Sequence, residues 1–243
     1  FSGDAITAAI DFYDVDIKDA ISPLSSFDAY RNCFNADGQS NPSFSFADPG
    51  GFCQLIHRDD AGRRLNVDAP YFNLGAIRTS GADVQLNWRG DVGANSMYVN
   101  TVLNYLNDYE VQSTPGGPVI SSAGTLAEGG QFDWRLFTTV GYDFDAVSLG
   151  LRWRHLPSVK DASAATNPAT TTIGPSSYDG FVLFGRWAVN DMVSLRFGVD
   201  NVLDTEPEIV GAIPGITNAR GSTNPGYYDV LGRRAFVAVK LTF

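Results

Sequence analysis

The chain has 243 residues, of which 18% are charged and 12% aromatic, and its formal net charge is −10. This acidic balance argues against a nucleic-acid partner, because phosphate binding requires clustered Lys and Arg. No apolar run approaches the length of a membrane helix. The mean hydropathy close to zero is nevertheless compatible with transmembrane β-strands, in which apolar and polar residues alternate.

The first alternating segment, AITAAIDFYDVDIK at about 5–18, is predicted to be a strand. Its end contains Asp14, Asp16 and Asp19, a spacing that faintly resembles a calcium-binding loop. Lys18 stands where a third acidic ligand would be needed, and no glycine follows it. We therefore interpret these residues as the rim of a strand and predict no metal site in the chain.

Two cysteines, Cys33 and Cys53, lie in the long polar stretch that follows. In an exported protein such a pair indicates a disulfide, which would stabilise the closed loop by about 3 kcal/mol. The alternative is a pair of cytosolic thiols or metal ligands. A zinc site would need a second Cys pair or a His-rich segment, which the sequence lacks. The disulfide is therefore our prediction.

Seven further segments alternate between apolar and polar residues, so each is predicted to be a strand with one face in each of two media. In ADVQLNWR, Ala, Val, Leu and Trp share one face, and Asp, Gln, Asn and Arg share the other. One segment, 178–189, is apolar on both faces, and the pattern does not assign its sides. The seven segments lie at about 82–89, 96–111, 131–145, 147–154, 178–189, 193–200 and 232–243.

Short and long connections alternate between these segments. The short ones lie at about 90–95, 145–146 and 190–191, and the long ones at about 19–76, 112–130, 157–177 and 204–229. All long connections therefore fall at one end of the sheet, as in outer-membrane barrels with tight periplasmic turns and long extracellular loops. The pattern predicts an all-β, antiparallel, up-and-down transmembrane barrel. It places the C-terminus on the periplasmic side and the long loops outside the cell.

Aromatic residues occur at the borders of the expected apolar band. Trp134 and Tyr142 share one face and are separated by about 20 Å along the membrane normal, and Phe132 and Phe144 by about 30 Å. These separations bracket a band about 25 Å tall. We predict a membrane girdle of Phe132, Trp134, Tyr142, Phe144 and Trp153.

The opposite face carries charged residues: Arg135, Arg152, Arg154, Arg196 and Arg234, with Asp133, Asp143 and Asp200. The favoured interpretation is a salt-bridged wall facing a lumen. The functional alternative is that Arg152 and Arg154, near the loop end, guide an anionic ligand inward. Tyr71 and Phe72 are candidates for stacking on a ligand, whereas interface anchoring is favoured for Tyr178, Tyr227 and Tyr228.

The C-terminal region, GVDNVLDTEP at 198–207 and YYDVLGRRAFVAVKLTF at 227–243, closely resembles the ending of TonB-dependent outer-membrane receptors. In that family an N-L-F-D-like turn leaves the penultimate strand, and the last strand begins with a Tyr near a Gly-Arg pair and ends on an aromatic residue. Asn201 and Asp204 match the ends of the first element. Upstream, NLGAIRTSGADVQLNW resembles the family segment in which Gly81 precedes an acidic residue, here Asp83.

The resemblance implies that residues 1–243 are the C-terminal portion of a 22-stranded receptor barrel, about eight strands without the N-terminal plug. It also implies that Tyr228, Phe236, Leu241 and Phe243 belong to a signal for the barrel-assembly machinery. The expected function is TonB-energised uptake of a scarce solute, such as a siderophore, vitamin or oligosaccharide. The expected location is the outer membrane of a Gram-negative bacterium, in contact with lipid and lipopolysaccharide. TonB would act through the missing N-terminal region, and no cofactor is expected.

Two alternatives belong to other classes of protein. One is a self-contained eight-stranded outer-membrane barrel, acting as a hydrolase through His155 or as an adhesin-like structural protein. The other is a secreted β-sandwich with the girdle aromatics in its core. The sequence contains no P-loop, G-x-S-x-G or H-E-x-x-H motif. We therefore predict that the chain is not an enzyme and interpret His155 as part of the girdle.

Overall fold

The computed structural model describes residues 5–36, 38, 40–47, 51–112, 119–126, 131–167, 169–209 and 223–242, without the side chains of Ser22, Phe72 and Leu74. Its elements are β1 (Ala5–Pro23), α1 (Ser26–Cys33), η1 (Phe52–Leu55), β2 (Ile56–Arg58), β3 (Arg64–Val67), β4 (Tyr71–Val92), β5 (Asn95–Gln112), β6 (Val119–Ser121), β7 (Trp134–Phe144), β8 (Val147–Leu156), η3 (Ala162–Ala165), β9 (Tyr178–Ala188), β10 (Val193–Asp200) and β11 (Arg234–Leu241). None of the helices within these residues is long and apolar enough to cross a bilayer.

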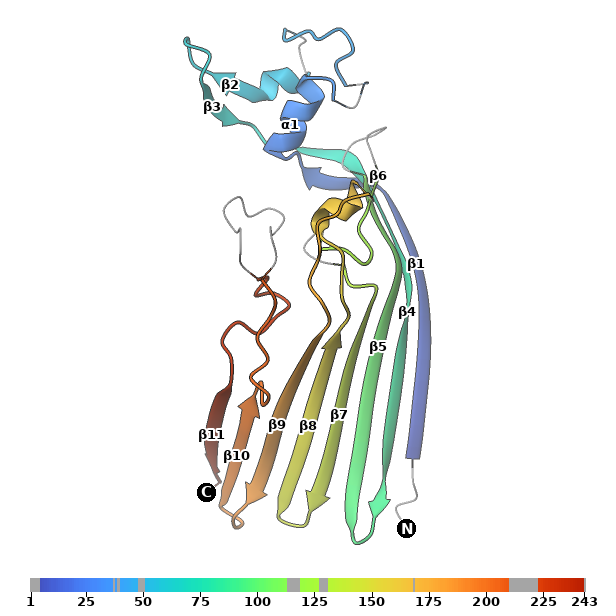
Figure 1. Cartoon of the computed structure of the whole chain (residues 1–243), viewed down its shortest axis with the longest axis vertical. Helices are drawn as coiled ribbons and strands as arrows, with labels where there is room; N and C mark the ends of the chain where they lie inside the picture. The colour runs from blue at the N-terminus through green and yellow to red at the C-terminus, as the bar shows by residue number, and fades with distance from the viewer. Residues whose placement is uncertain are drawn as a thin grey trace. The chain divides into compact units, whose positions relative to one another are not determined.

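The main sheet is antiparallel and up-and-down, with strand order β1-β4-β5-β7-β8-β9-β10-β11 and the short β6 beside β5 (Figure 1). Each strand of this order overlaps one of the eight alternating segments, so the predicted all-β fold is confirmed; β4 begins at Tyr71, eleven residues before the segment predicted there. Within the described residues β1 and β11 each have a single neighbour, and the sheet is open. The described strands thus form one open antiparallel sheet.

The connections alternate as the sequence predicted. The tight connections are Gly93–Ala94, Asp145–Ala146 and the four residues 189–192. Gly93 and Asp145 have positive φ, of 69° and 44°. All three lie at one end of the strands, together with the C-terminal end of β11 (Figure 1). Leu241 pairs there with Val193, the first residue of β10. The long connections leave the opposite end.

The pairing register defines two faces of the sheet. The apolar face carries the cross-strand row Val140, Leu151, Leu183, Val199 and Ala235. The polar face is the opposite one, and it includes Thr139, Arg152 and Arg186. This register also assigns the strand whose pattern was ambiguous. Phe181, Leu183 and Trp187 of β9 lie on the apolar face, and Val182, Phe184 and Arg186 on the polar face.

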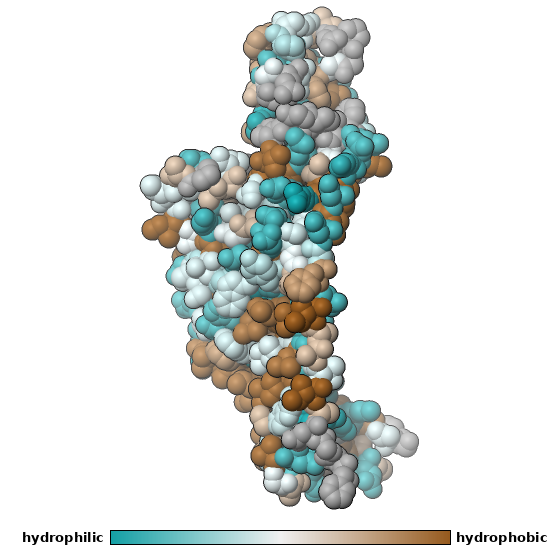
Figure 2. All heavy atoms as spheres, turned by 90° about the vertical axis from the view of Figure 1, so that its right-hand side faces the viewer, coloured by the Kyte–Doolittle hydropathy of each residue, from teal (hydrophilic) through white to brown (hydrophobic). Residues whose placement is uncertain are grey.

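Large apolar side chains are exposed on β1, which among the described strands pairs only with β4. Phe12 is 82% exposed and Ile6 is 71% exposed. Figure 2 shows apolar side chains gathered over the strands above a polar turn end. Such a continuous exposed apolar surface is unusual for a soluble monomer and suits contact with an apolar medium.

One cross-strand row on the polar face consists of glycines and aromatic residues: Tyr98, Gly141, Gly150, Phe184, Gly198 and Phe236. Each aromatic ring lies over a glycine of an adjacent strand. A Cβ added at Gly141 would lie 2.1 Å from the Tyr98 ring. The corresponding distances are 2.3 Å from Gly150 to the Phe184 ring and 2.6 Å from Gly198 to the Phe236 ring. The rings therefore occupy the space that side chains at these glycines would fill, which fixes the register of neighbouring strands.

The chain divides into two compact units, and the strands β1, β4 and β5 contribute to both. Unit 1 comprises 1–13, 80–108 and 122–243 and has a small buried core in its loops. This loop core consists of Leu126, Phe132, Leu156, Val159, Tyr178 and Tyr228.

Unit 2 comprises 14–79 and 109–121 and contains α1, η1 and the β2–β3 hairpin. Ser25 caps α1, since its side chain accepts a hydrogen bond from the Asp28 backbone N–H. A disulfide joins Cys33 at the end of α1 to Cys53 in η1. The buried Asn41 donates to the Cys33 and Ser45 carbonyls at 2.7 and 3.1 Å. The disulfide and this amide together anchor α1.

Candidate functional site

A cavity of about 530 Å³ lies on the polar face near the loop end of unit 1. Its wall consists of residues from β7, β8, β9, β10 and β11, and the segment 225–231 borders it. This volume lies within the range of about 300–1,000 Å³ that is typical of small-molecule sites. The cavity contains both arginines that the sequence analysis proposed for ligand contact.

Arg152 and Arg154 project from β8 onto aromatic rings of β9. The guanidinium carbon of Arg152 lies 5.6 Å from the centre of the Phe184 ring, and that of Arg154 lies 5.7 Å from the centre of the Tyr178 ring. At these distances the ring quadrupole attracts the cation. Neither arginine has an ion-pair partner among the described residues. Their positive charges are therefore held in place and left uncompensated.

The predicted salt-bridged wall is mostly wrong for the described part of the chain. Of the five arginines assigned to this face, only Arg234 makes an ion pair there, 3.7 Å from Asp200 and 3.5 Å from Asp229. Asp143 pairs instead with Arg89, which the prediction did not include, at 3.9 Å. Alternation assigns a residue to a face, but it does not say which charges meet across the strands.

Two tyrosines complete the cavity from the loop core. Tyr178 and Tyr228 are each 4% exposed, and their rings meet edge to face at 5.4 Å between centroids. Neither hydroxyl has a hydrogen-bond partner among the described residues. A buried donor without an acceptor is costly, so these hydroxyls call for a partner that the described residues do not supply.

Burial, followed by the negative charge of Glu208, raises the pKa of Tyr228 to about 12, against an opposing effect of Arg154. Glu208 belongs to the same loop region. Glu208 accepts hydrogen bonds from the Ser176 hydroxyl and from the Ser176 backbone N–H, the latter at 2.8 Å, and these bonds lower the pKa of Glu208.

The Tyr228 shift predicts a pH dependence. Because the folded-state pKa lies above the usual value of about 10, the stabilisation from neutral Tyr228 is complete below about pH 10 and is lost as the pH rises through about 12. Absorbance at the tyrosinate wavelength should show one tyrosine titrating near pH 12, and Tyr228→Phe should remove that component. An unchanged titration curve in Tyr228→Phe would contradict this assignment.

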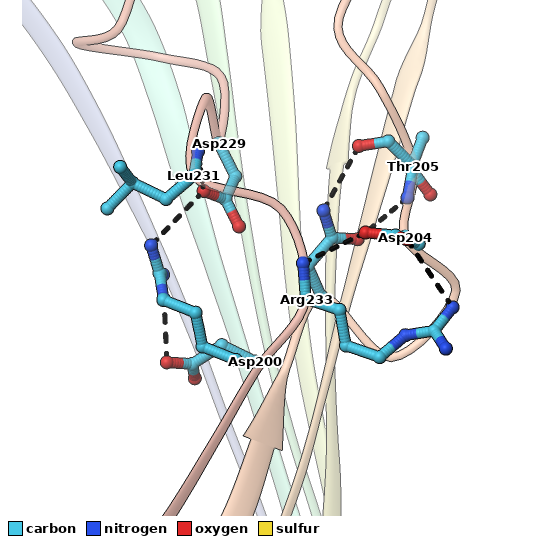
Figure 3. Close-up of polar contacts among 8 residues, drawn as sticks. Asp200, Asp204, Thr205, Asp229, Leu231 and Arg233 are labelled. Carbon is cyan, nitrogen blue, oxygen red and sulfur yellow. Dashed lines mark hydrogen bonds and ion pairs between the residues drawn. The ribbon is translucent and has the colours of Figure 1, made fainter.

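The turn after β10 is closed by polar contacts that Figure 3 shows. Asn201 is buried and has φ of 50°. Its side chain accepts from the Thr205 N–H at 2.9 Å and donates to the Thr205 carbonyl at 3.1 Å. Asp204 then accepts from the Arg233 backbone N–H at 2.9 Å. The turn leaving β10 is thereby fastened to the residue that precedes β11.

A second set of contacts in Figure 3 links the same two segments beside the cavity. Arg234, the first residue of β11, bridges Asp200 at the end of β10 and Asp229 in the loop. Asp229 also accepts from the Leu231 N–H at 2.9 Å. These contacts position the segment 225–231 over the cavity. They also explain physically why Asn, Asp and a Gly-Arg pair occur together in this stretch of sequence.

A second group of cations lies at the turn end of the polar face, around another cavity. Arg186 and Arg196 are direct cross-strand partners, and Lys240 lines the same cavity. Like charges directly opposite each other destabilise a sheet. This group provides a useful comparison for Arg152 and Arg154, because it has the same charge on the same face at the other end of the strands.

Four of the five predicted girdle residues lie on the apolar face. Trp134 and Trp153 lie toward the loop end, and Tyr142 and Phe144 lie toward the turn end. Phe132 differs from the prediction, because it precedes β7 and is buried in the loop core, where its ring contacts Tyr227 at 5.1 Å. The chain leaves the strand path before Trp134, so the alternation that included Phe132 does not describe its environment.

His155 also lies on the apolar face, in register with Leu136 and Asp179. Its Nδ1 is 2.8 Å from an Asp179 oxygen, and its ring stacks on Trp134 at 4.8 Å. The Trp153 indole N–H donates to the same Asp179 oxygen at 2.6 Å. The described contacts of His155 are thus a carboxylate and aromatic rings, and none of them is a nucleophilic side chain.

The remaining predicted site residues are dispersed. Tyr71 begins β4 in unit 2 and is 72% exposed, whereas the Phe72 side chain and Phe243 lie outside the described residues. Phe236 is on the polar face over Gly198, and Leu241 ends β11. Tyr228 lies in the loop core and not in the last strand. Within the described residues no cluster of His, Cys, Asp and Glu could hold a metal ion.

The sequence matches the family model described as "TonB dependent receptor-like, beta-barrel" over residues 1–202. No curated protein matches the sequence. Among solved structures, "Copper transporter OprC" is similar with a TM-score of 0.50 and 15% sequence identity, covering 100% of this chain and 30% of that chain. At this identity the likeness concerns the fold alone. The chain spans less than a third of the length of that transporter.

Proposed function

This chain belongs to the TonB-dependent receptor family, and from that premise we propose that it forms part of the barrel wall of an outer-membrane active transporter for a scarce solute. The observation that carries the proposal is the combination of the family match with a sheet whose two faces differ. The apolar face would contact lipid, and the polar face would line the lumen. The host would be a Gram-negative bacterium.

The long connections would lie outside the cell in this arrangement, and the tight turns would lie in the periplasm. The cavity beside Arg152 and Arg154 would then open near the outer mouth of the lumen, where an arriving solute is first held. Energy would come from TonB, acting on the plug domain and N-terminal segment that the family carries before its barrel strands. The barrel-assembly machinery would insert the wall, with lipopolysaccharide as its outer neighbour.

The proposal assigns the chain no covalent chemistry. His155, the centre of the hydrolase alternative, contacts Asp179 and two tryptophans on the face assigned to lipid. Aromatic and amphipathic rings are typical of the border between the apolar band and the headgroups. We therefore assign His155 to the girdle at the loop end.

Uptake measurements test this function. Cells expressing the full receptor that carries this chain should accumulate one class of labelled solute by a saturable process. Loss of TonB, or collapse of the proton gradient, should abolish that accumulation. Accumulation that persists without TonB would contradict active transport. Lipid hydrolysis that disappears in His155→Ala would favour the enzymatic alternative.

A further inference from the structure

The cavity of unit 1 offers hydrogen-bond donors in excess of acceptors. Three guanidinium groups, of Arg152, Arg154 and Arg234, line it with two carboxylates. Both carboxylates, those of Asp200 and Asp229, are already paired with Arg234. The positive charges of Arg152 and Arg154 are therefore available to a ligand, and both are pre-positioned by an aromatic ring.

The two orphan hydroxyls add to this set of donors. Tyr178 and Tyr228 line the same cavity, and both are almost completely buried without a described partner. Two of the donors lie beside Gly180. The Arg154 Nε and the Tyr178 hydroxyl are each 3.9 Å from the point that a Cβ at Gly180 would occupy, and the Tyr178 ring is 3.3 Å from it. The guanidinium of Arg154 and the phenol of Tyr178 therefore border the same part of the cavity.

We propose that this cavity binds an oxyanion group of the transported solute, with Arg152 and Arg154 as its cationic contacts and the hydroxyls of Tyr178 and Tyr228 as further donors. Carboxylates and phosphates both fit, because each offers several acceptor oxygens to guanidinium groups. The inference rests on the proposed function, since it names the chemical class of the solute. The ligand proposed for this cavity is an anion, whereas the name of the structurally similar transporter gives copper.

The aromatic-glycine row lies between this cavity and the second cationic group on the same face. Gly150 and Phe184 of that row separate Arg152 from Arg186 along β8 and β9. Among the described residues, the polar face therefore presents cations without an ion-pair partner on both sides of this row, Arg152 and Arg154 on one side and Arg186 and Arg196 on the other. An anion would experience attraction at each end of this path, whereas a free metal cation would be repelled.

Calorimetric titration of the purified full receptor tests the proposal. The probes are citrate and inorganic phosphate, which distinguish a carboxylate from a phosphate, with glucose as an uncharged control. The double variant Arg152→Gln/Arg154→Gln should weaken binding of the preferred anion about tenfold or more, since each lost contact is a hydrogen bond to a charged group. Tyr178→Phe and Tyr228→Phe, which remove only a hydroxyl, should each weaken it about threefold or more.

Arg186→Gln/Arg196→Gln is the matched control, because it removes the same two charges from the same face at the turn end. It should change anion affinity less than about twofold, as a distant site does. Equal loss in Arg186→Gln/Arg196→Gln would mean that the general positive potential of the wall binds the anion, and it would overturn the site. Absence of binding by either anion, or equal binding of glucose, would also overturn it.

Two outcomes separate this inference from the proposed function. TonB-dependent uptake of an uncharged solute, without anion binding, would refute the inference and leave active transport standing. Anion binding at this site without energised uptake would refute the transport function alone. Anion binding that appears only after removal of the plug domain would show that an acidic segment of the plug occupies the cavity, and the inference would be wrong.

Discussion

Replacing Gly81 by alanine is expected to destabilise the folded sheet by about 3 kcal/mol, the upper part of the usual cost of overpacking. A Cβ at Gly81 would lie 2.2 Å from the Tyr105 carbonyl oxygen and 2.5 Å from the Tyr13 hydroxyl. Tyr13 can rotate, but the carbonyl belongs to the backbone of β5. Relief would therefore require β4 and β5 to separate locally, with loss of cross-strand hydrogen bonds.

Gly141→Ala provides the control for this prediction. Its Cβ would be equally close to an obstacle, 2.1 Å from the Tyr98 ring, but the atoms concerned are the far end of a side chain. The ring can swing toward the open polar face at a smaller cost. Urea unfolding, followed by the loss of the folded band on unheated gels, should place Gly81→Ala well below Gly141→Ala. Equal midpoints for the two variants would contradict the role assigned to the backbone contact.

The second large effect is expected at Asn201. Alanine there would remove both side-chain hydrogen bonds to Thr205 and leave a buried residue at φ of 50°, at a cost of about 2 kcal/mol. The turn that positions Asp204 would then open, and Asp204 would no longer accept the hydrogen bond from the Arg233 backbone N–H. We expect faster proteolysis in the connection between β10 and β11, and weaker closure of the cavity.

Asn201→Gly separates the two contributions. Glycine tolerates positive φ, so it retains the backbone conformation and loses only the amide contacts. Its unfolding midpoint should lie between those of the native chain and Asn201→Ala. If Asn201→Gly is as stable as the native chain, the amide contributes nothing and only the conformation matters. If Asn201→Ala is also unchanged, the proposed closure of the turn is wrong.

The strands of the sheet could be predicted from the sequence because alternation is a direct consequence of having different media on the two faces. The same signal has limits that β9 illustrates. Its residues are apolar on both faces because two apolar residues, Val182 opposite Arg152 and Phe184 over Gly150, lie on the polar face. Only the register with β8 and β10 identifies the side of each residue.

Other features depended on contacts between distant segments. Phe132 and Tyr228 meet in the loop core although nearly a hundred residues separate them, and no local pattern predicts that. The helix α1 was missed, although Ser25 and Asp28 give a recognisable start signal. Arg152 and Arg154 were identified from the sequence, but the tyrosine hydroxyls beside them became visible only from their burial.

We propose that this wall crosses the outer membrane with its long connections outside. The most direct test is labelling of intact cells with a maleimide too large to cross that membrane. Ser158→Cys probes the connection between β8 and β9, and Asp191→Cys probes the tight turn between β9 and β10. Both positions are exposed. The native cysteines, Cys33 and Cys53, are joined in a disulfide and do not react with the maleimide. We expect labelling of Ser158→Cys in intact cells and of Asp191→Cys only after the membrane is permeabilised. Labelling of Asp191→Cys in intact cells, with Ser158→Cys protected, would contradict it.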